Sequence, residues 1–190
     1  MRTAIAKRVR WTVKEYFRMS AAGMLGERRV ELLNGELIEM PAQATPHRIS
    51  ISKTVRLLCG AFDATHWMLV QGTLVLSSRH APDPDFHIFD VPVGTPDNCL
   101  PIPLLVIEIS DSTYRKDSGP KLRAYARAGI PDYWIFNLPQ DRVEVYRQPE
   151  NPTGLPRGWR YASIDHRIRG QTVTPLLRPA ISLAVEDMLP

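Results

Sequence analysis

A carboxylate stands inside an apolar run of this chain, in the segment PLLVIEISDS at residues 103–112. Because a buried carboxylate loses its hydration, proteins rarely keep one in such a place without a partner. Side chains alternate along a strand, so Glu108 shares a face with Val106 and Ser110, near the carboxyl end of the strand. This is the edge at which α/β proteins tend to open their sites.

A second carboxylate, Asp85, follows Pro84 and precedes the apolar run that ends at Phe89. Two carboxylates on neighbouring strand ends can share a divalent cation, which offsets the cost of burying both. Hard cations such as Mg²⁺ prefer carboxylate oxygens and keep several waters. The residues alone leave plainer interpretations open: Asp85 can serve a turn after a proline, and Glu108 can pair with Arg115 or Lys116.

The third candidate is Lys121, which we place in the first turn of a helix that follows the Glu108 strand directly. In this prediction Ser118 caps the helix and Pro120 lies in its first turn. Tyr125 comes four residues after Lys121 and shares its helix face. An ammonium group there could orient a metal-bound water or stabilise charge on a phosphate. The alternative is a solvated surface lysine.

The elements that must position these residues follow from periodicity and turn signals. A capping box at Thr12 predicts a short helix, and Asn34-Gly35 predicts a hairpin turn. A core helix is expected from Thr45, which caps it, with Pro46 at its first position and an early end near Gly60. The remaining predicted elements are strands at about 68–77, 83–90 and 104–110, a helix ending at Gly129, a strand at PDYWIFN, and a hairpin of DRVEVYRQ and GWRYASID.

Composition narrows the class of protein. The chain of 190 residues fits one domain, and its only cysteines, Cys59 and Cys99, favour a reducing cytoplasm over a disulfide framework. The start, MRTAIAKRVRW, lacks the apolar region of a secretory signal, and no apolar run approaches the length of a bilayer span. We therefore expect no membrane partner. The net charge of +4 favours a polyanionic partner only slightly.

Other catalytic motifs are missing from the sequence. The five histidines lack the paired spacing of a zinc site, and there is no CxxC pair. GxSxG, Walker and GxGxxG patterns do not occur, which disfavours hydrolase, NTPase and dinucleotide-binding functions. The segment RGWRYASIDHRIR interleaves arginine with aromatics, a pattern that suits nucleic-acid backbones but equally suits the alternation of a hairpin.

Three motifs together resemble a known family. The residues PD at 84–85, VIEIS at 106–110 and DSGPKLRAYARAGIPDYWIFN at 117–137 resemble the bacterial family of putative restriction endonucleases, within the PD-(D/E)XK nuclease superfamily. The segments RRVELLNGELIEM and TPHRISISKTVRLL resemble the family's N-terminal hairpin and first core helix. The resemblance covers roughly residues 12–147, and KLRAYARAGIPDYW is its most specific part.

The resemblance implies a role for each matching residue. Asp85 and Glu108 would bind the metal, and Lys121 would be the catalytic lysine. The superfamily usually places that lysine two residues after the glutamate, where this chain has Ser110, so the family moves it to the following helix. Glu31 in the hairpin and His47 at the start of the core helix also match, as outer metal ligands or proton-transfer groups. Tyr125 and Ser110 are expected to lie just behind the site.

These observations lead to a prediction for the whole chain. We expect an α/β fold with a restriction-endonuclease-like mixed central sheet flanked by helices, and an N-terminal helix and β-hairpin extension. It forms one domain over residues 1–190 with a core at about 45–147. The implied function is Mg²⁺-dependent DNA hydrolysis, with Mn²⁺ as a substitute and a homodimer left open. The alternatives are a catalytically silent DNA- or protein-binding module and a hydrolase of small phosphoesters.

Overall fold

The computed structural model describes residues 8–96 and 100–190 of the chain. The chain start that bears on a secretory signal, residues 1–7, lies outside these ranges, and so does Cys99. Cys59 is a free, exposed thiol. Within the described ranges, no helix is both long enough and apolar enough to cross a bilayer.

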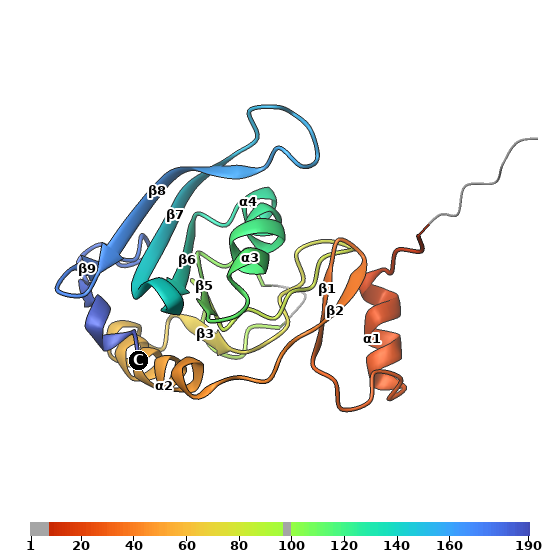
Figure 1. The fold of residues 1–190 in the computed structure, drawn as a ribbon, viewed down its shortest axis with the longest axis horizontal. Helices are drawn as coiled ribbons and strands as arrows, with labels where there is room; N and C mark the ends of the chain where they lie inside the picture. The colour runs from red at the N-terminus through yellow and green to blue at the C-terminus, as the bar shows by residue number, and fades with distance from the viewer. Residues whose placement is uncertain (1–7, 97–99) are drawn as a thin grey trace, which may run out of the picture.

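A six-stranded mixed sheet forms the centre of the molecule, as the sequence predicts (Figure 1). Its order is β3-β4-β5-β6-β7-β8, and only β5 and β6 run parallel to each other. Both of these strands are fully buried, which explains why their sequences are apolar on both faces. The strands are β3 (Trp67–Val70), β4 (Phe86–Phe89), β5 (Leu105–Ser110), β6 (Asp132–Asn137), β7 (Arg142–Glu150) and β8 (Arg160–Ile168).

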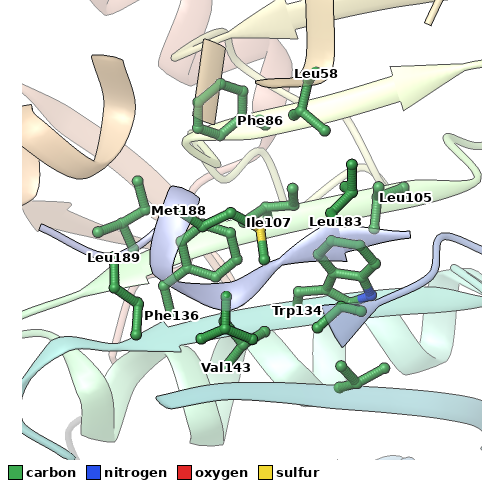
Figure 2. Close-up of a cluster of buried hydrophobic side chains, with 14 of the residues drawn as sticks. Leu58, Phe86, Leu105, Ile107, Trp134, Phe136, Val143, Leu183, Met188 and Leu189 are labelled. Atoms are coloured by element: carbon green, nitrogen blue, oxygen red, sulfur yellow. The ribbon is translucent and has the colours of Figure 1, made fainter. Parts of the chain in front are cut away.

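Helices cover the two faces of this sheet. On one face, α2 (Thr45–Ala61) packs Leu58 against Leu105 and Ile107 of β5. The C-terminal segment completes this core with Leu183, Met188 and Leu189, next to Trp134 and Phe136 (Figure 2). That segment contains β9 (Thr172–Val173), β10 (Leu183–Ala184) and η4 (Val185–Asp187). On the opposite face, α4 (Leu122–Ala128) packs Tyr125 against Val106 and Tyr133.

The predicted N-terminal extension lies to one side of the sheet (Figure 1). It consists of α1 (Val13–Ala21), β1 (Val30–Leu33) and β2 (Glu36–Glu39). Thr12 and Glu15 form the predicted capping box, and Asn34 and Gly35 both have positive φ angles, 51° and 74°, as a type I′ turn requires. The hairpin joins the core through Leu32, whose backbone exchanges hydrogen bonds of 3.1 and 2.8 Å with Ala81.

Several predicted boundaries are wrong. Ala44, not Thr45, caps α2, and Pro46 is the second helical residue. The helix continues through Gly60, because burial of Leu58 and Ala61 against the sheet outweighs the low helix propensity of glycine. The strands β3 and β4 are shorter than 68–77 and 83–90, because Gln71, directly after β3, adopts a left-handed conformation (φ 55°) that interrupts the extended backbone.

The helix after β5 also differs from the prediction. It begins with α3 (Tyr114–Lys116), widens into a π-helical turn, η2 (Asp117–Lys121), and continues as α4. Ser118 is therefore no cap, and its hydroxyl donates to Tyr114 O. The wider turn accommodates Pro120, which lacks an N–H. Gly129 ends the helix at φ 81°, as predicted. The short helix η3 (Leu138–Gln140) then connects β6 to β7.

Candidate active site

A small cavity of about 80 Å³ lies at the carboxyl end of β5. The elements around it are the start of α2, the residues before β4, and the helical segment that follows β5. Its walls bring together the three central residues of the sequence-based hypothesis, Asp85, Glu108 and Lys121. The other charged or titratable side chains in the lining are those of Arg29, His47, Asp83, Asp111, Lys116 and Asp117.

Glu108 is 3% exposed and receives two hydrogen bonds on the same oxygen, Oε1. Lys121 Nζ donates at 2.8 Å and the Tyr125 hydroxyl donates at 2.6 Å. Both donors come from one face of the helix, as the i, i+4 spacing predicts. Burial raises the pKa of Glu108 well above its usual value, and the Lys121 charge opposes that rise. The alternative in which Glu108 pairs with Arg115 or Lys116 is wrong, because Lys121 takes that place.

Lys121 is one of the most buried charged residues in the described structure, with an exposed fraction of 2%. Its ammonium lies 2.8 Å from Glu108 Oε1 and 3.0 Å from Glu31 Oε2. Burial alone would lower the pKa of Lys121, but the charges of Glu108 and Glu31 outweigh burial and raise it. A solvated surface lysine is therefore excluded. The predicted location in a first helical turn is also wrong, because the helix begins at Tyr114 and Lys121 ends the π-helical turn.

Asp85 is held in place by three donors. The backbone N–H of Ile109 donates to Oδ2 at 2.8 Å, and Gln71 Nε2 donates to Oδ1 at 3.3 Å. His47 Nε2, in the first turn of α2, lies 3.2 Å from Oδ2. Burial works to raise the pKa of Asp85, but the hydrogen bonds from His47 and Ile109 and the charges of His47 and Lys121 keep it below its usual value. Asp85 thus stays ionised beside the cavity.

Glu31 reaches the site from the N-terminal hairpin and is fully buried. Its Oε1 lies 2.5 Å from Lys116 Nζ, and its Oε2 lies 3.0 Å from Lys121 Nζ. Burial would raise the pKa of Glu31, but the charges of Lys121 and Lys116 outweigh it and lower the pKa. The extension is therefore joined to the site by two ion pairs, a buried one to Lys121 and a partly buried one to Lys116.

Ser110 lies on the same face of β5 as Glu108 but contacts a different group. Its hydroxyl donates to Asp117 Oδ2 at 2.6 Å, and Thr113 donates to the same oxygen at 2.5 Å. These bonds fix the π-helical turn against the end of β5. Ser110 thus lies behind the site, while Tyr125 contacts Glu108 directly.

Two further carboxylates lie at the cavity: Asp83, which the sequence reasoning missed, and Asp117, which it placed near the site only as a helix cap or ion-pair partner. Each has one buried oxygen, Oδ1, that accepts no hydrogen bond from the described residues. Burial, aided by the nearby charge of Glu31, raises the pKa of Asp83. The spacing Asp-Pro-Asp at 83–85 is the signal that could have indicated a second acid. Asp117 belongs to the motif that ends in Lys121, but its spacing is equally typical of a helix cap.

The carboxylates around the cavity could supply a divalent cation with only a small number of protein ligands. Among the described residues, no group of three or more His, Cys, Asp or Glu side chains is arranged to hold a metal ion. Mg²⁺, however, needs only one or two protein carboxylates and completes its shell with water and substrate phosphate. Asp85 and Glu108 meet that requirement, and Asp83 and Asp117 lie in the same lining, each with an Oδ1 atom that accepts no hydrogen bond from the described residues.

The arginine-aromatic segment contains β8, which lies three strands away from β5 in the sheet. Its Arg160 pairs with Glu150, at the end of β7 far from the site. Its Ile168 lies opposite Arg142, which pairs with Asn137 at the carboxyl end of β6 and so marks the site's end of the sheet. Alternation within the β7–β8 hairpin accounts for the pattern.

This fold and this group of buried acids and lysines at a strand end define a nuclease-like α/β protein of the restriction-endonuclease type. A family model described as "Putative restriction endonuclease", Uma2, matches residues 13–186. The chain belongs to that family. The match extends beyond the resemblance seen in the sequence and includes the C-terminal segment that covers α2.

A solved structure supports the assignment of the fold. The crystal structure of a putative nuclease of the DUF820 family from Anabaena variabilis ATCC 29413 aligns with a TM-score of 0.64 and 17% sequence identity. The alignment covers 85% of this chain and 90% of that chain. A comparison with curated proteins gave no significant match.

Proposed function

We propose that this protein is a Mg²⁺-dependent endonuclease that hydrolyses phosphodiester bonds of DNA, with Mn²⁺ able to replace Mg²⁺. The observation that carries the proposal is the convergence of Asp85, Glu108 and Lys121 on one cavity at the end of β5. Membership of a family described by nuclease activity supports it. The basic balance of the chain, +4, is compatible with a polyanionic substrate.

Each residue has a distinct part in this mechanism. Asp85 and Glu108 would hold the ion, which would supply Lewis-acid chemistry by lowering the pKa of a water molecule and polarising the phosphate. His47 orients Asp85, and Tyr125 orients Glu108, through the hydrogen bonds of 3.2 and 2.6 Å. Lys121 fixes a positive charge beside Glu108, which balances the negative charge that develops on the phosphate.

Three basic side chains, those of Arg29, Lys116 and Lys121, line the cavity among the carboxylates of Asp83, Asp85, Glu108, Asp111 and Asp117. Basic side chains in this place suit a phosphate group, and membership of a family described by nuclease activity favours DNA over a small phosphoester. A cytoplasmic location is also part of the proposal, and the question of a homodimer is left open.

Calorimetry with Mn²⁺ tests the metal site. Wild type should bind the ion, and Asp85→Asn and Glu108→Gln should each weaken binding, because each removes one anionic ligand while keeping the side chain's size. Asp165→Asn, an exposed carboxylate on β8, is the control and should bind as wild type does. Equal Mn²⁺ affinity in all four proteins would contradict the site.

A further inference from the structure

The ammonium of Lys121 has no donor to spare for a substrate. An ammonium group has three N–H donors. Those of Lys121 face Glu108 Oε1 at 2.8 Å, Glu31 Oε2 at 3.0 Å and the backbone oxygen of Asp83 at 3.4 Å. With an exposed fraction of 2%, Lys121 could bond to a phosphate only by releasing one of these partners.

Lys116 is in a different position. Among the described residues its ammonium has one acceptor, Glu31 Oε1 at 2.5 Å. Its side chain is 18% exposed and lines the cavity. Two of its three donors are therefore free to bond to a group that enters the cavity.

The π-helical turn explains how both lysines reach one carboxylate. In a regular α-helix, residues five apart point about 140° away from each other. Within η2, the N–H of Leu122 bonds to Asp117 O, five residues earlier, so the turn is wider than an α-helical turn. Lys116 and Lys121 thereby point to the same side of the helical segment. There each ammonium group contacts a different oxygen of Glu31.

We propose that Lys116 is the residue that donates hydrogen bonds to a non-bridging oxygen of the scissile phosphate. Lys121 is then a positioning residue, which neutralises Glu108 and Glu31 and contributes its charge without touching the substrate. Glu31 holds the Lys116 ammonium at the cavity wall. This inference rests on the proposed nuclease function and assigns the phosphate contact within it.

Single-turnover cleavage of a DNA duplex, at saturating DNA and Mg²⁺, tests the assignment. Lys116→Met should cleave about 100-fold more slowly than wild type, the loss typical for removal of one donor to a developing charge. Lys116→Arg should recover most of the rate, because it restores a donor and a charge. Arg115→Met removes the neighbouring exposed charge and should leave the rate unchanged.

Mn²⁺ calorimetry on the same variants separates a phosphate contact from damage to the metal site. Lys116→Met should bind Mn²⁺ as wild type does. A folded Lys116→Met that cleaves as fast as Arg115→Met would overturn the proposal, and so would a loss of rate that follows a matching loss of Mn²⁺ affinity. If Lys116→Met fails to fold, Lys116→Gln takes its place, and equal rates for Lys116→Gln and Lys116→Arg overturn the proposal. Failure of wild type to cleave DNA would instead remove the proposed function itself.

Discussion

At the scale of residues, a chain of ion pairs adjoins the two acids of the proposed metal site. Lys121 is shared by Glu108 and Glu31, and Glu31 is shared by Lys121 and Lys116. Burial of so many charges is tolerated only because each has a partner of opposite sign. Removal of one member therefore affects the stability of the fold as well as any chemistry.

Lys121→Ala should lower the free energy of unfolding by about 3–5 kcal/mol, because it leaves buried carboxylates without their cation. Urea unfolding followed by circular dichroism measures the change. Lys14→Ala, on the exposed face of α1, is the control and should change stability by less than about 0.5 kcal/mol. Similar values for the two variants would show that Lys121 is not buried among the acids.

His47→Ala should weaken Mn²⁺ binding by about 10–100-fold without removing a proposed ligand, because His47 orients Asp85. Calorimetry measures the affinity, and His166→Ala, an exposed histidine on β8, serves as the control. Unchanged affinity in His47→Ala would limit His47 to a packing role.

At the scale of elements, the sequence predicted those helix caps, turns and strands whose formation depends on residues close together in the chain. The capping box of α1, the Asn34-Gly35 turn and the buried strands β5 and β6 follow from neighbouring residues. The length of α2 and the π-helical turn could not be predicted, because they depend on packing against distant segments. An example is the Ser50 hydroxyl, which donates to Met188 O across 138 residues of sequence.

The same division applies to the candidate site. Asp85, Glu108 and Lys121 were indicated by their motifs, and the structure brings them to one cavity. The Asp-Pro-Asp spacing at 83–85 could have indicated Asp83, but the contact of Lys116 with Glu31 and the place of Asp117 in the cavity lining could not be derived from spacing. Both depend on where tertiary structure places the N-terminal hairpin and the π-helical turn.

Two glycine substitutions test the account of the elements. Gly35→Ala should destabilise the protein by at least about 1 kcal/mol, because φ is 74° and an added Cβ would lie 2.9 Å from Trp11 O. Gly60→Ala should stabilise it by about 0.5–1 kcal/mol, since Gly60 is helical and its Cβ would meet nothing within 4 Å. Thermal unfolding measures both, and changes of the same sign would contradict this account.

At the scale of the whole molecule, a hydrophobic core lies on each face of the central sheet. The candidate site lies between these two cores, at the carboxyl end of β5. The α2 core and the α4 core are separated by β5, so Ile109 faces one core while Glu108 faces the other. Ile109 N–H bonds to Asp85 and Glu108 bonds to the helix, which ties the site to both sides of the sheet. The stability of the site and of the fold are therefore linked.

The pH dependence of stability should report on a buried histidine of β4. Burial lowers the pKa of His87 to about 4, from about 6.5 in the unfolded chain. As pH falls, the unfolded chain therefore binds a proton on His87 before the folded protein does. The stability due to neutral His87 is complete above pH about 6.5 and is lost as pH falls toward 4. The expected loss between pH 6.5 and 5 is about 2 kcal/mol.

Urea unfolding of metal-free wild type and His87→Leu, at a series of pH values, isolates this effect. The difference between the two stability profiles should change by about 2 kcal/mol over that range, because the other titrating groups are common to both proteins. Parallel profiles would mean that His87 titrates normally in the folded state.

Cleavage of supercoiled plasmid DNA tests the central claim most directly. Wild type with Mg²⁺ should convert the plasmid to nicked or linear forms, and added chelator should stop the reaction. Asp85→Asn and Glu108→Gln should lose this activity while remaining folded, whereas Asp165→Asn should cleave as wild type does. Cleavage that persists in both site variants, or that is absent from folded wild type with either Mg²⁺ or Mn²⁺, would contradict the account.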